Sequence, residues 1–430
     1  MEQQWKQLAE GVELLVNRTD KFKTGLLSVT LTVPLRREDA TAGALIPEVL
    51  YRGSKSYPDM ERLSAATDGL YGASLGPAVR QRGESQCVSF LCSVIDDRYA
   101  LDGGAVLEPA AALMGEVLLD PAVEGGVFRT DYVKSEGANL ADRIRARVND
   151  KRSWSIFRLI QEMCGQEAYA VDKLGDAEEA LSATPEGLWA DYQALLGRAK
   201  VTFYYGGSAR PERVEETVRR AFAPLISGRR APVECAVPAQ PQGPVRTVTD
   251  ELDVTQGKLA MGFRTGGVTM DSPDYPALLV CNALYGGSAN SRLFLHVREK
   301  LSLCYYASSL IDKLKGLLVV SSGVEFGDFD RAQEAILAQL DELRAGRFTD
   351  DERSAAIRTV VNSLRGRLDS QGQMEDDCVT KLVYGVQPDD GGALIQSVER
   401  VTAEDVARAA QRIRLDTVYR LTGKEGAAHG

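Results

Sequence analysis

Histidine is the residue type that this sequence has least of, since its 430 residues include only His296 and His429. A zinc site built on imidazoles takes at least two histidines, and a Ser-His-Asp or Cys-His site takes one beside its nucleophile. His296 lies in an arginine-rich segment without a nucleophile elbow, and His429 lies in an Ala-Ala-His-Gly tail. We therefore expect no hydrolytic site that is complete within this chain.

Three further absences narrow the classes of function. The seven cysteines include no Cys-x-x-Cys pair and are odd in number, which predicts neither a zinc knuckle nor a disulfide framework. A net charge of -10 and the lack of a dense Lys/Arg run argue against binding to nucleic acid. No apolar run approaches the roughly 18 residues of a membrane span, and Met1 to Asn17 lacks the apolar region of a secretory signal. We expect a cytoplasmic protein without membrane contact.

Strand and helix patterns recur along the chain. With 44% hydrophobic and 26% charged residues, the composition is that of an ordinary globular protein. Residues 26–35 are rich in β-branched side chains and predict a strand, residues 36–39 a turn, and residues 42–51 a helix. The same order of strand and helix is predicted again over residues 258–263 and 275–285. Two copies of one folding unit would explain this recurrence.

The ends of the two predicted helices are similar in sequence. Leu50 to Ser54 reads LYRGS and Leu284 to Ser288 reads LYGGS, an offset of 284 minus 50, or 234 residues, which indicates duplication of a whole domain. Between the copies, residues 227–247 carry four prolines and few large apolar residues, which is typical of an extended linker. The sequence thus predicts an N-terminal domain over residues 1–226 and a C-terminal domain over residues 248–425.

The remaining patterns set the fold class. Further strands are predicted over 87–95, 199–205 and 316–324, and further helices over 132–147, 153–164, 186–196, 211–222, 329–345, 350–368 and 403–412. Because these elements are interspersed without regular βαβ spacing, we expect α+β domains in which largely antiparallel sheets pack with helices.

Residues 42–59, AGALIPEVLYRGSKSYPD, resemble the zinc-binding helix of pitrilysin/insulinase-type peptidases, which normally carries H-x-x-E-H. In that family the two histidines bind zinc and the glutamate activates the bound water. The resemblance places Ala44 and Glu48 at the histidine positions and Pro47 at the glutamate position. It implies that all three zinc-site roles are lost.

The family's third zinc ligand is a glutamate on a later helix, seven residues after another acidic residue. Residues 134–148 resemble this helix, with Glu136 at the earlier acidic position and Arg143 at the ligand position. A cation at that position opposes metal binding. An alignment shifted by one residue would place Asp142 there instead, and the histidines would still be missing. The resemblance therefore implies no metal in this chain.

The second half of the chain keeps more of the family pattern. Residues 284–309 closely resemble the C-terminal motif, in which an arginine and a tyrosine seven residues apart close over the substrate beside the zinc. Arg298 and Tyr305 have this spacing. A guanidinium can bind a peptide carbonyl or carboxylate, and a phenol can stabilise an oxyanion. The alternative is structural, with Arg298 in a salt bridge to a neighbour such as Glu299 and Tyr305 in a strand core.

The resemblance is nearest to inactive-type chains of Gram-positive bacteria that occur paired with an active chain. It implies a non-catalytic subunit of a heterodimeric zinc peptidase, with zinc in an H-x-x-E-H partner and unfolded peptides as substrate. Modification of an elongation factor and maturation of secreted peptides both stay open as pathways, as does homodimerisation without the partner. The alternative function is a structural or peptide-binding protein of the same fold with no role in proteolysis.

Overall fold

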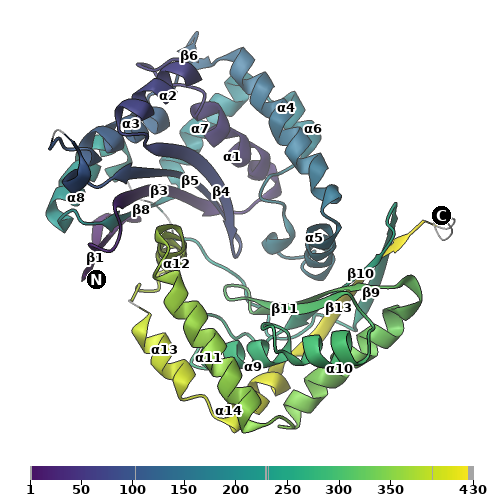
Figure 1. Cartoon of the computed structure of the whole chain (residues 1–430). Helices are drawn as coiled ribbons and strands as arrows, with labels where there is room; N and C mark the ends of the chain where they lie inside the picture. Colours follow the sequence, from purple (N-terminus) through teal and green to yellow (C-terminus); the bar gives the residue numbers. More distant parts are fainter. Residues whose placement is uncertain (1, 102, 228–229, 231, 390, 425–430) are drawn as a thin grey trace. The chain divides into compact units, whose positions relative to one another are not determined.

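The computed structural model describes residues 2–101, 103–227, 230, 232–389 and 391–424 (Figure 1). Two compact units are formed from interleaved segments of the chain. Unit 1 comprises Met1–Ala146, Val171–Glu234 and Leu368–Asp390, and unit 2 comprises Arg147–Ala170, Cys235–Arg367 and Gly391–Gly430. His429 and the end of the expected C-terminal domain lie outside the described residues.

Unit 1 is built on a six-stranded sheet. Its strands, in spatial order, are β1 (Glu2–Ala9), β2 (Val12–Arg18), β8 (Lys200–Gly207), β3 (Thr24–Pro34), β5 (Ser85–Ile95) and β4 (Ser74–Arg82). Only β2 and β8 pair in parallel, and the other neighbours are antiparallel. A separate hairpin joins β6 (Val123–Glu124) to β7 (Val127–Phe128). The central strands are buried on both faces, which explains the long apolar run of β3.

Unit 2 repeats this topology in a five-stranded sheet. Its strands, in spatial order, are β9 (Arg246–Leu252), β13 (Arg414–Gly423), β10 (Gly257–Arg264), β12 (Leu317–Val324) and β11 (Tyr306–Asp312). Again one pair is parallel, β9 with β13, and the rest are antiparallel. If β1 is left out, the strands of the two sheets have the same spatial order: β2, β8, β3, β5 and β4 in unit 1 correspond to β9, β13, β10, β12 and β11 in unit 2. The shared topology supports the internal duplication predicted from the sequence.

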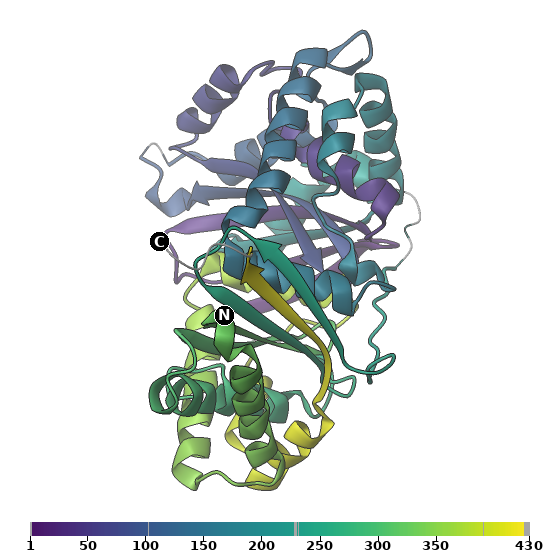
Figure 2. The same cartoon turned by 90° about the vertical axis from the view of Figure 1, so that its right-hand side faces the viewer.

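Helices cover one face of each sheet (Figure 1). In unit 1 these are α1 (Arg37–Leu50), α2 (Met60–Gly69), α3 (Leu107–Leu119), α4 (Thr130–Ala146), α6 (Ala177–Ser182), α7 (Pro185–Arg198) and α8 (Pro211–Ala221). In unit 2 they are α9 (Tyr275–Tyr285), α10 (Phe329–Arg344), α11 (Asp350–Arg367), α13 (Gly392–Glu399) and α14 (Ala403–Arg412), with a π-helix over Leu293–Lys300. Figure 2 shows this layering in unit 2, with the yellow strand β13 lying between green strands. Each unit has its own large apolar core between sheet and helices.

One further helix packs on the opposite face of each sheet, and it comes from the other half of the chain. Helix α12 (Gln371–Val383) belongs to unit 1, where Val379 and Leu382 bury against Leu15 and Tyr204. Helix α5 (Lys151–Met163) belongs to unit 2 and packs on β10 and β13. It approaches β10 closely, because a Cβ on Gly262 would lie 2.4 Å from the sulfur of Met163. No sequence pattern predicted this exchange.

The α+β class, the duplicated helix-backed sheets and their largely antiparallel pairing confirm the predicted fold. The predicted turn at residues 36–39 is wrong, because α1 begins at Arg37 and uses Glu38 and Asp39 as its first turn. Acidic side chains there favour the positive end of the helix dipole. Residues 228, 229 and 231 of the expected linker lie outside the described residues, and residues 232–245 form neither helix nor strand.

Short 3₁₀ turns complete the described secondary structure, at Asp97–Tyr99, Arg147–Asn149, Ala168–Ala170, Ala223–Ile226 and Phe326–Asp328. All seven cysteines lie among the described residues and are free thiols, six of them buried. Among the described helices, none combines the length and apolar character needed to cross a membrane.

Candidate functional site

Helix α1 carries the three positions at which the sequence resembles a zinc helix. Ala44 is fully buried in the core of unit 1 and offers no ligand atom. Pro47 lies inside the helix, where its carbonyl still accepts a hydrogen bond from the backbone N–H of Tyr51 at 3.1 Å. Glu48, four residues after Ala44, keeps about a quarter of its side chain exposed. Of these three residues, only Glu48 presents a charged group.

Arg143 on α4 reaches Glu48 directly. Its Nη1 lies 2.7 Å from Oε1 of Glu48, although 95 residues separate the two in sequence. The positions matched to a histidine ligand and to the third ligand are therefore in direct contact. An arginine at the ligand position neutralises the carboxylate that would otherwise face a metal.

Glu136, about two helical turns before Arg143 on α4, also forms hydrogen bonds within the protein. Its Oε1 accepts a hydrogen bond from Nη1 of Arg52 at 3.1 Å, and its Oε2 accepts one from Nδ2 of Asn139 at 3.0 Å. The guanidinium of Arg52 also stacks on the ring of Tyr132, 5.0 Å from its centre. No group of three or more His, Cys, Asp or Glu suited to a metal occurs in the described part of the chain. The residues at the zinc positions do not fit a zinc ion.

Arg298 lies in the π-helix of unit 2, near its end. The wide turn of a π-helix is formed by hydrogen bonds between residues five apart, here from the N–H of Leu301 to the carbonyl of His296 at 3.1 Å. Such turns are frequent at functional sites. The Arg298 guanidinium stacks 4.7 Å from the ring centre of Phe294 and lies 3.5 Å from Glu299, with 39% of the side chain exposed. The expected salt bridge to Glu299 exists, and it leaves the guanidinium accessible.

Tyr305 lies directly before strand β11 and is 58% exposed, so it is not part of the strand core. Its backbone N–H donates to the carbonyl of Gly323 at 2.8 Å, which fixes the main chain, and its hydroxyl donates to the carboxylate of Glu325. This hydrogen bond raises the pKa of the Tyr305 phenol. The phenol is therefore protonated at neutral pH, and its single O–H is engaged by Glu325 in this structure. Arg298 and Tyr305 make no direct contact with each other among the interactions of the described residues.

His296, the histidine within the described residues, is also in the π-helix. Burial lowers its pKa, and the nearby charges of Arg292 and Lys300 lower it further. The imidazole is therefore mostly neutral at pH 7.

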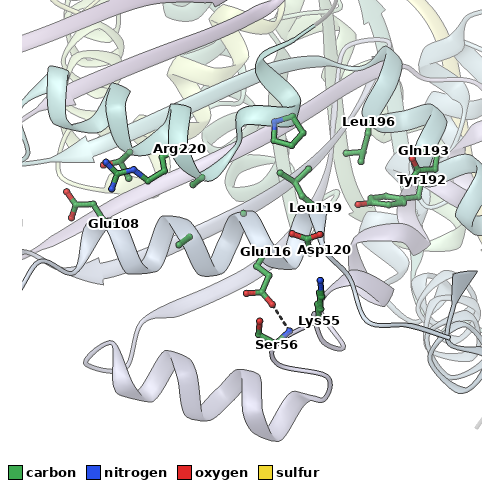
Figure 3. Close-up of a pocket in the computed structure, with 15 residues that line it drawn as sticks. Lys55, Ser56, Glu108, Glu116, Leu119, Asp120, Tyr192, Gln193, Leu196 and Arg220 are labelled. Carbon is green, nitrogen blue, oxygen red and sulfur yellow. Dashed lines mark hydrogen bonds between the residues drawn. The ribbon is translucent and has the colours of Figure 1, made fainter. Parts of the chain in front are cut away.

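A pocket that sequence reasoning missed opens on unit 1 between α3, α7 and α8, with a volume of about 650 Å³ (Figure 3). Burial alone would raise the pKa of Glu116 at its edge, but hydrogen bonds from the Ser56 N–H at 2.7 Å and the Ser54 hydroxyl at 2.8 Å lower it. Tyr192 lines the pocket with its hydroxyl bound to the carbonyl of Leu118 at 2.8 Å. None of the individual site residues predicted from the sequence lines this pocket, although Lys55 and Ser56 of the segment 42–59 do.

Two helix-backed sheets that share a five-strand topology, with the zinc positions replaced in the first and the Arg/Tyr motif present in the second, define an inactive-type peptidase fold. The chain belongs to the M16 family of pitrilysin/insulinase-type peptidases, as an inactive-type member. The family description "Peptidase M16 inactive domain" matches residues 182–360. The "Probable inactive metalloprotease YmfF" of Bacillus subtilis (strain 168) is 34% identical over 425 residues, which cover 97% of each protein.

Solved structures extend the comparison. A conserved protein from Enterococcus faecalis V583 matches with a TM-score of 0.90 and 25% identity, covering 99% of both chains. A peptidase M16 inactive domain from Pseudomonas fluorescens matches with a TM-score of 0.80 and 18% identity, again over 99% of both chains. The latter likeness concerns the fold alone.

Proposed function

We propose that this chain is the non-catalytic subunit of a heterodimeric zinc peptidase and that Arg298 and Tyr305 act on the substrate beside a partner's zinc. The partner carries H-x-x-E-H and the metal, and the substrate is an unfolded peptide. The proposal places the assembly in the cytoplasm, as the sequence analysis expects. Whether the chain forms a homodimer without its partner is decided by the experiment below.

The observation that carries the proposal is the contrast between the two motif regions. At the zinc positions, Glu48 and Arg143 pair with each other at 2.7 Å, so the one carboxylate there faces a cation of the chain itself. The Arg/Tyr motif keeps both of its residue types, with Arg298 39% and Tyr305 58% exposed beside Glu299 and Glu325. This difference in residue types, together with the exposure of the second motif, supports a role for that motif in trans.

The chemistry of the two groups suits peptide hydrolysis by a neighbouring metal. The guanidinium of Arg298 carries donors in a fixed fork that matches a carbonyl or a carboxylate. The protonated phenol of Tyr305 can donate to the oxyanion of a tetrahedral intermediate once its single O–H turns from Glu325 to that oxygen. Losing one such donor typically costs about 100-fold in kcat.

The test is a peptidase assay on a quenched unfolded peptide, with the chain alone, the H-x-x-E-H protein encoded beside it alone, and the two mixed. We expect cleavage that a zinc chelator abolishes, and only in the mixture. Size-exclusion chromatography of the same samples reports the heterodimer and the state of each chain alone. If the neighbour alone cleaves as fast as the mixture, the proposal fails and the structural or peptide-binding alternative replaces it.

Two variants test the residues themselves. Arg298→Ala and Tyr305→Phe should each lower kcat of the mixture by about 100-fold while the heterodimer still assembles. The matched controls are Arg365→Ala, which removes another exposed arginine, and Tyr99→Phe, which alters another exposed tyrosine. Unchanged kcat in both site variants would refute the role in trans.

A further inference from the structure

Tyr306 packs across the sheet of unit 2 onto a glycine. It pairs with Gly323 on the neighbouring strand β12, and a Cβ on Gly323 would lie 2.7 Å from Cε1 of the Tyr306 ring. The ring therefore covers the backbone of Gly323, an arrangement in which an aromatic side chain shields a strand glycine. Because side chains alternate along a strand, Tyr306 and Ser308 share one face of β11, on the same side of the sheet as α5.

Two cations from different elements approach this ring. The guanidinium carbon of Arg152, in the first turn of α5, lies 4.4 Å from the ring centre, and its Nη2 donates to the Ser308 hydroxyl at 2.8 Å. The ammonium of Lys258, on β10, lies 5.9 Å from the same centre and donates to the side-chain carbonyl of Gln256. Burial lowers the pKa of Lys258. Two positive charges therefore gather around one aromatic ring.

Neither cation forms a salt bridge among those of the described residues. The nearby carboxylate of Asp150 is the N-cap of α5, where it accepts from the backbone N–H groups of Arg152 and Ser153, each at 3.1 Å, and from the Ser153 hydroxyl at 2.6 Å. Its charge interacts with Arg152 electrostatically, without a salt bridge between the two side chains.

Other cations on the same face of the sheet are paired with carboxylates. Arg264 lies six residues after Lys258 on β10, so the two side chains leave the sheet on the same side. Arg264 pairs with Glu167 at 2.6 Å and with Asp416 at 3.0 Å, and Lys315 pairs with Glu167 at 2.6 Å. This face of unit 2 thus pairs its buried cations with carboxylates, whereas the exposed Arg152 and the partly buried Lys258 form no salt bridge among the described residues.

We propose that Arg152, Lys258, Tyr306 and Ser308 form a subsite for a carboxylate of the bound peptide. A carboxylate placed there relieves the repulsion between the two cations and accepts charge-assisted hydrogen bonds from both. The ring of Tyr306 forms the floor of the subsite and favours the cations through its π-face. The inference rests on the proposed role in peptide binding and adds a preference for acidic peptides. The carboxylate comes from an aspartate or glutamate side chain or from the peptide's C-terminus.

Calorimetric titration of the full chain with unlabelled 15-residue unfolded peptides tests the subsite. One peptide carries glutamates and an amidated C-terminus, a second carries glutamines and a free C-terminus, and a third carries glutamines and an amide. We expect a charged peptide to bind about tenfold more tightly than the neutral one, as one exposed charge-assisted contact allows. Whichever of the two charged peptides shows this gain identifies the source of the carboxylate.

Variants separate the subsite from general peptide binding. Arg152→Gln and Lys258→Gln should each remove part of the preference, and together all of it, while the affinity for the neutral peptide stays unchanged. Arg365→Gln, which alters an exposed arginine paired with Glu399, should keep the full preference. Equal affinity of the unmodified chain for all three peptides would overturn the subsite and leave the proposed function standing. Absence of binding by every peptide would also overturn the subsite, while the cleavage assay with the partner decides the proposed function.

Discussion

The exchanged segment that contains α5 is fastened to unit 2 by a buried ionic cluster, and Glu167 is its centre. The carboxylate lies 2.6 Å from Arg264 and 2.6 Å from Lys315, whose side chains are 1% and 0% exposed. Replacing Glu167 by glutamine keeps the shape of the side chain but removes the negative charge that two buried cations share. Lys315 then retains the carbonyl of Ala236, and Arg264 retains Asp416.

Removing one partner of a buried ion pair costs about 3–5 kcal/mol of unfolding free energy. Because Arg264 keeps a second carboxylate and glutamine still accepts hydrogen bonds, we expect about 3 kcal/mol for Glu167→Gln. The matched control is Glu162→Gln, which weakens the partly exposed pair with Arg158 and should cost less than about 1 kcal/mol.

Urea unfolding followed by tryptophan fluorescence measures this difference. Trp154 on α5 is the one tryptophan in the ranges of unit 2, so replacement of Trp5 and Trp189 by phenylalanine makes the signal specific for that unit. A Glu167→Gln variant within about 0.5 kcal/mol of its parent would refute the role assigned to the cluster.

The pH dependence gives a second measurement on the same residue. Burial alone would raise the pKa of Glu167, but hydrogen bonds and charge from Arg264 and Lys315 lower it below the usual 4.5. A carboxyl whose folded pKa is lowered contributes stability that is present above its unfolded pKa and lost as the pH falls through the folded value. The parent should therefore lose this contribution below about pH 4.5, and Glu167→Gln should lack that part of the slope.

Two further predictions follow from close contacts. Gly115→Ala places a Cβ 2.4 Å from the backbone oxygen of Ala221 where α3 meets α8, and we expect a loss of about 1–3 kcal/mol in thermal unfolding; an unchanged melting temperature would contradict this packing. If the zinc positions are aligned correctly, Ala44→His and Glu48→His combined with Arg143→Glu should bind zinc at least about tenfold more tightly than the same two histidines with Arg143 retained. Equal zinc affinities in calorimetry would show that Arg143 does not occupy the ligand position.

Much of the fold followed from local patterns. The predicted strand over residues 26–35 and helix over residues 275–285 correspond to β3 and α9, because long β-branched runs and apolar helical patterns are strong local signals. Edge strands such as β1 and β9 were missed, since their charged and exposed residues lack a clear alternating pattern.

Only part of the candidate site could be predicted from the sequence. The spacing of Arg298 and Tyr305 was readable, but their exposure, the π-helix and the hydrogen bond to Glu325 depend on the packed structure. The basic group around Tyr306 could not be anticipated, because Arg152 and Lys258 lie 106 residues apart and meet only through α5 and β10.

The sequence by itself predicted the fold class from local patterns, the duplication from two similar motifs 234 residues apart, and, through the family resemblance, the replaced zinc positions. Only the tertiary structure decided that Glu48 and Arg143 would form an ion pair, and that α5 and α12 would each pack on the sheet of the other half of the chain. The reason is physical: helix propensity and amphipathicity specify that a helix buries an apolar face, but they do not specify which sheet receives it. For α5, Gly262 allows a close approach to β10, and the buried charges around Glu167 favour packing on the sheet of unit 2.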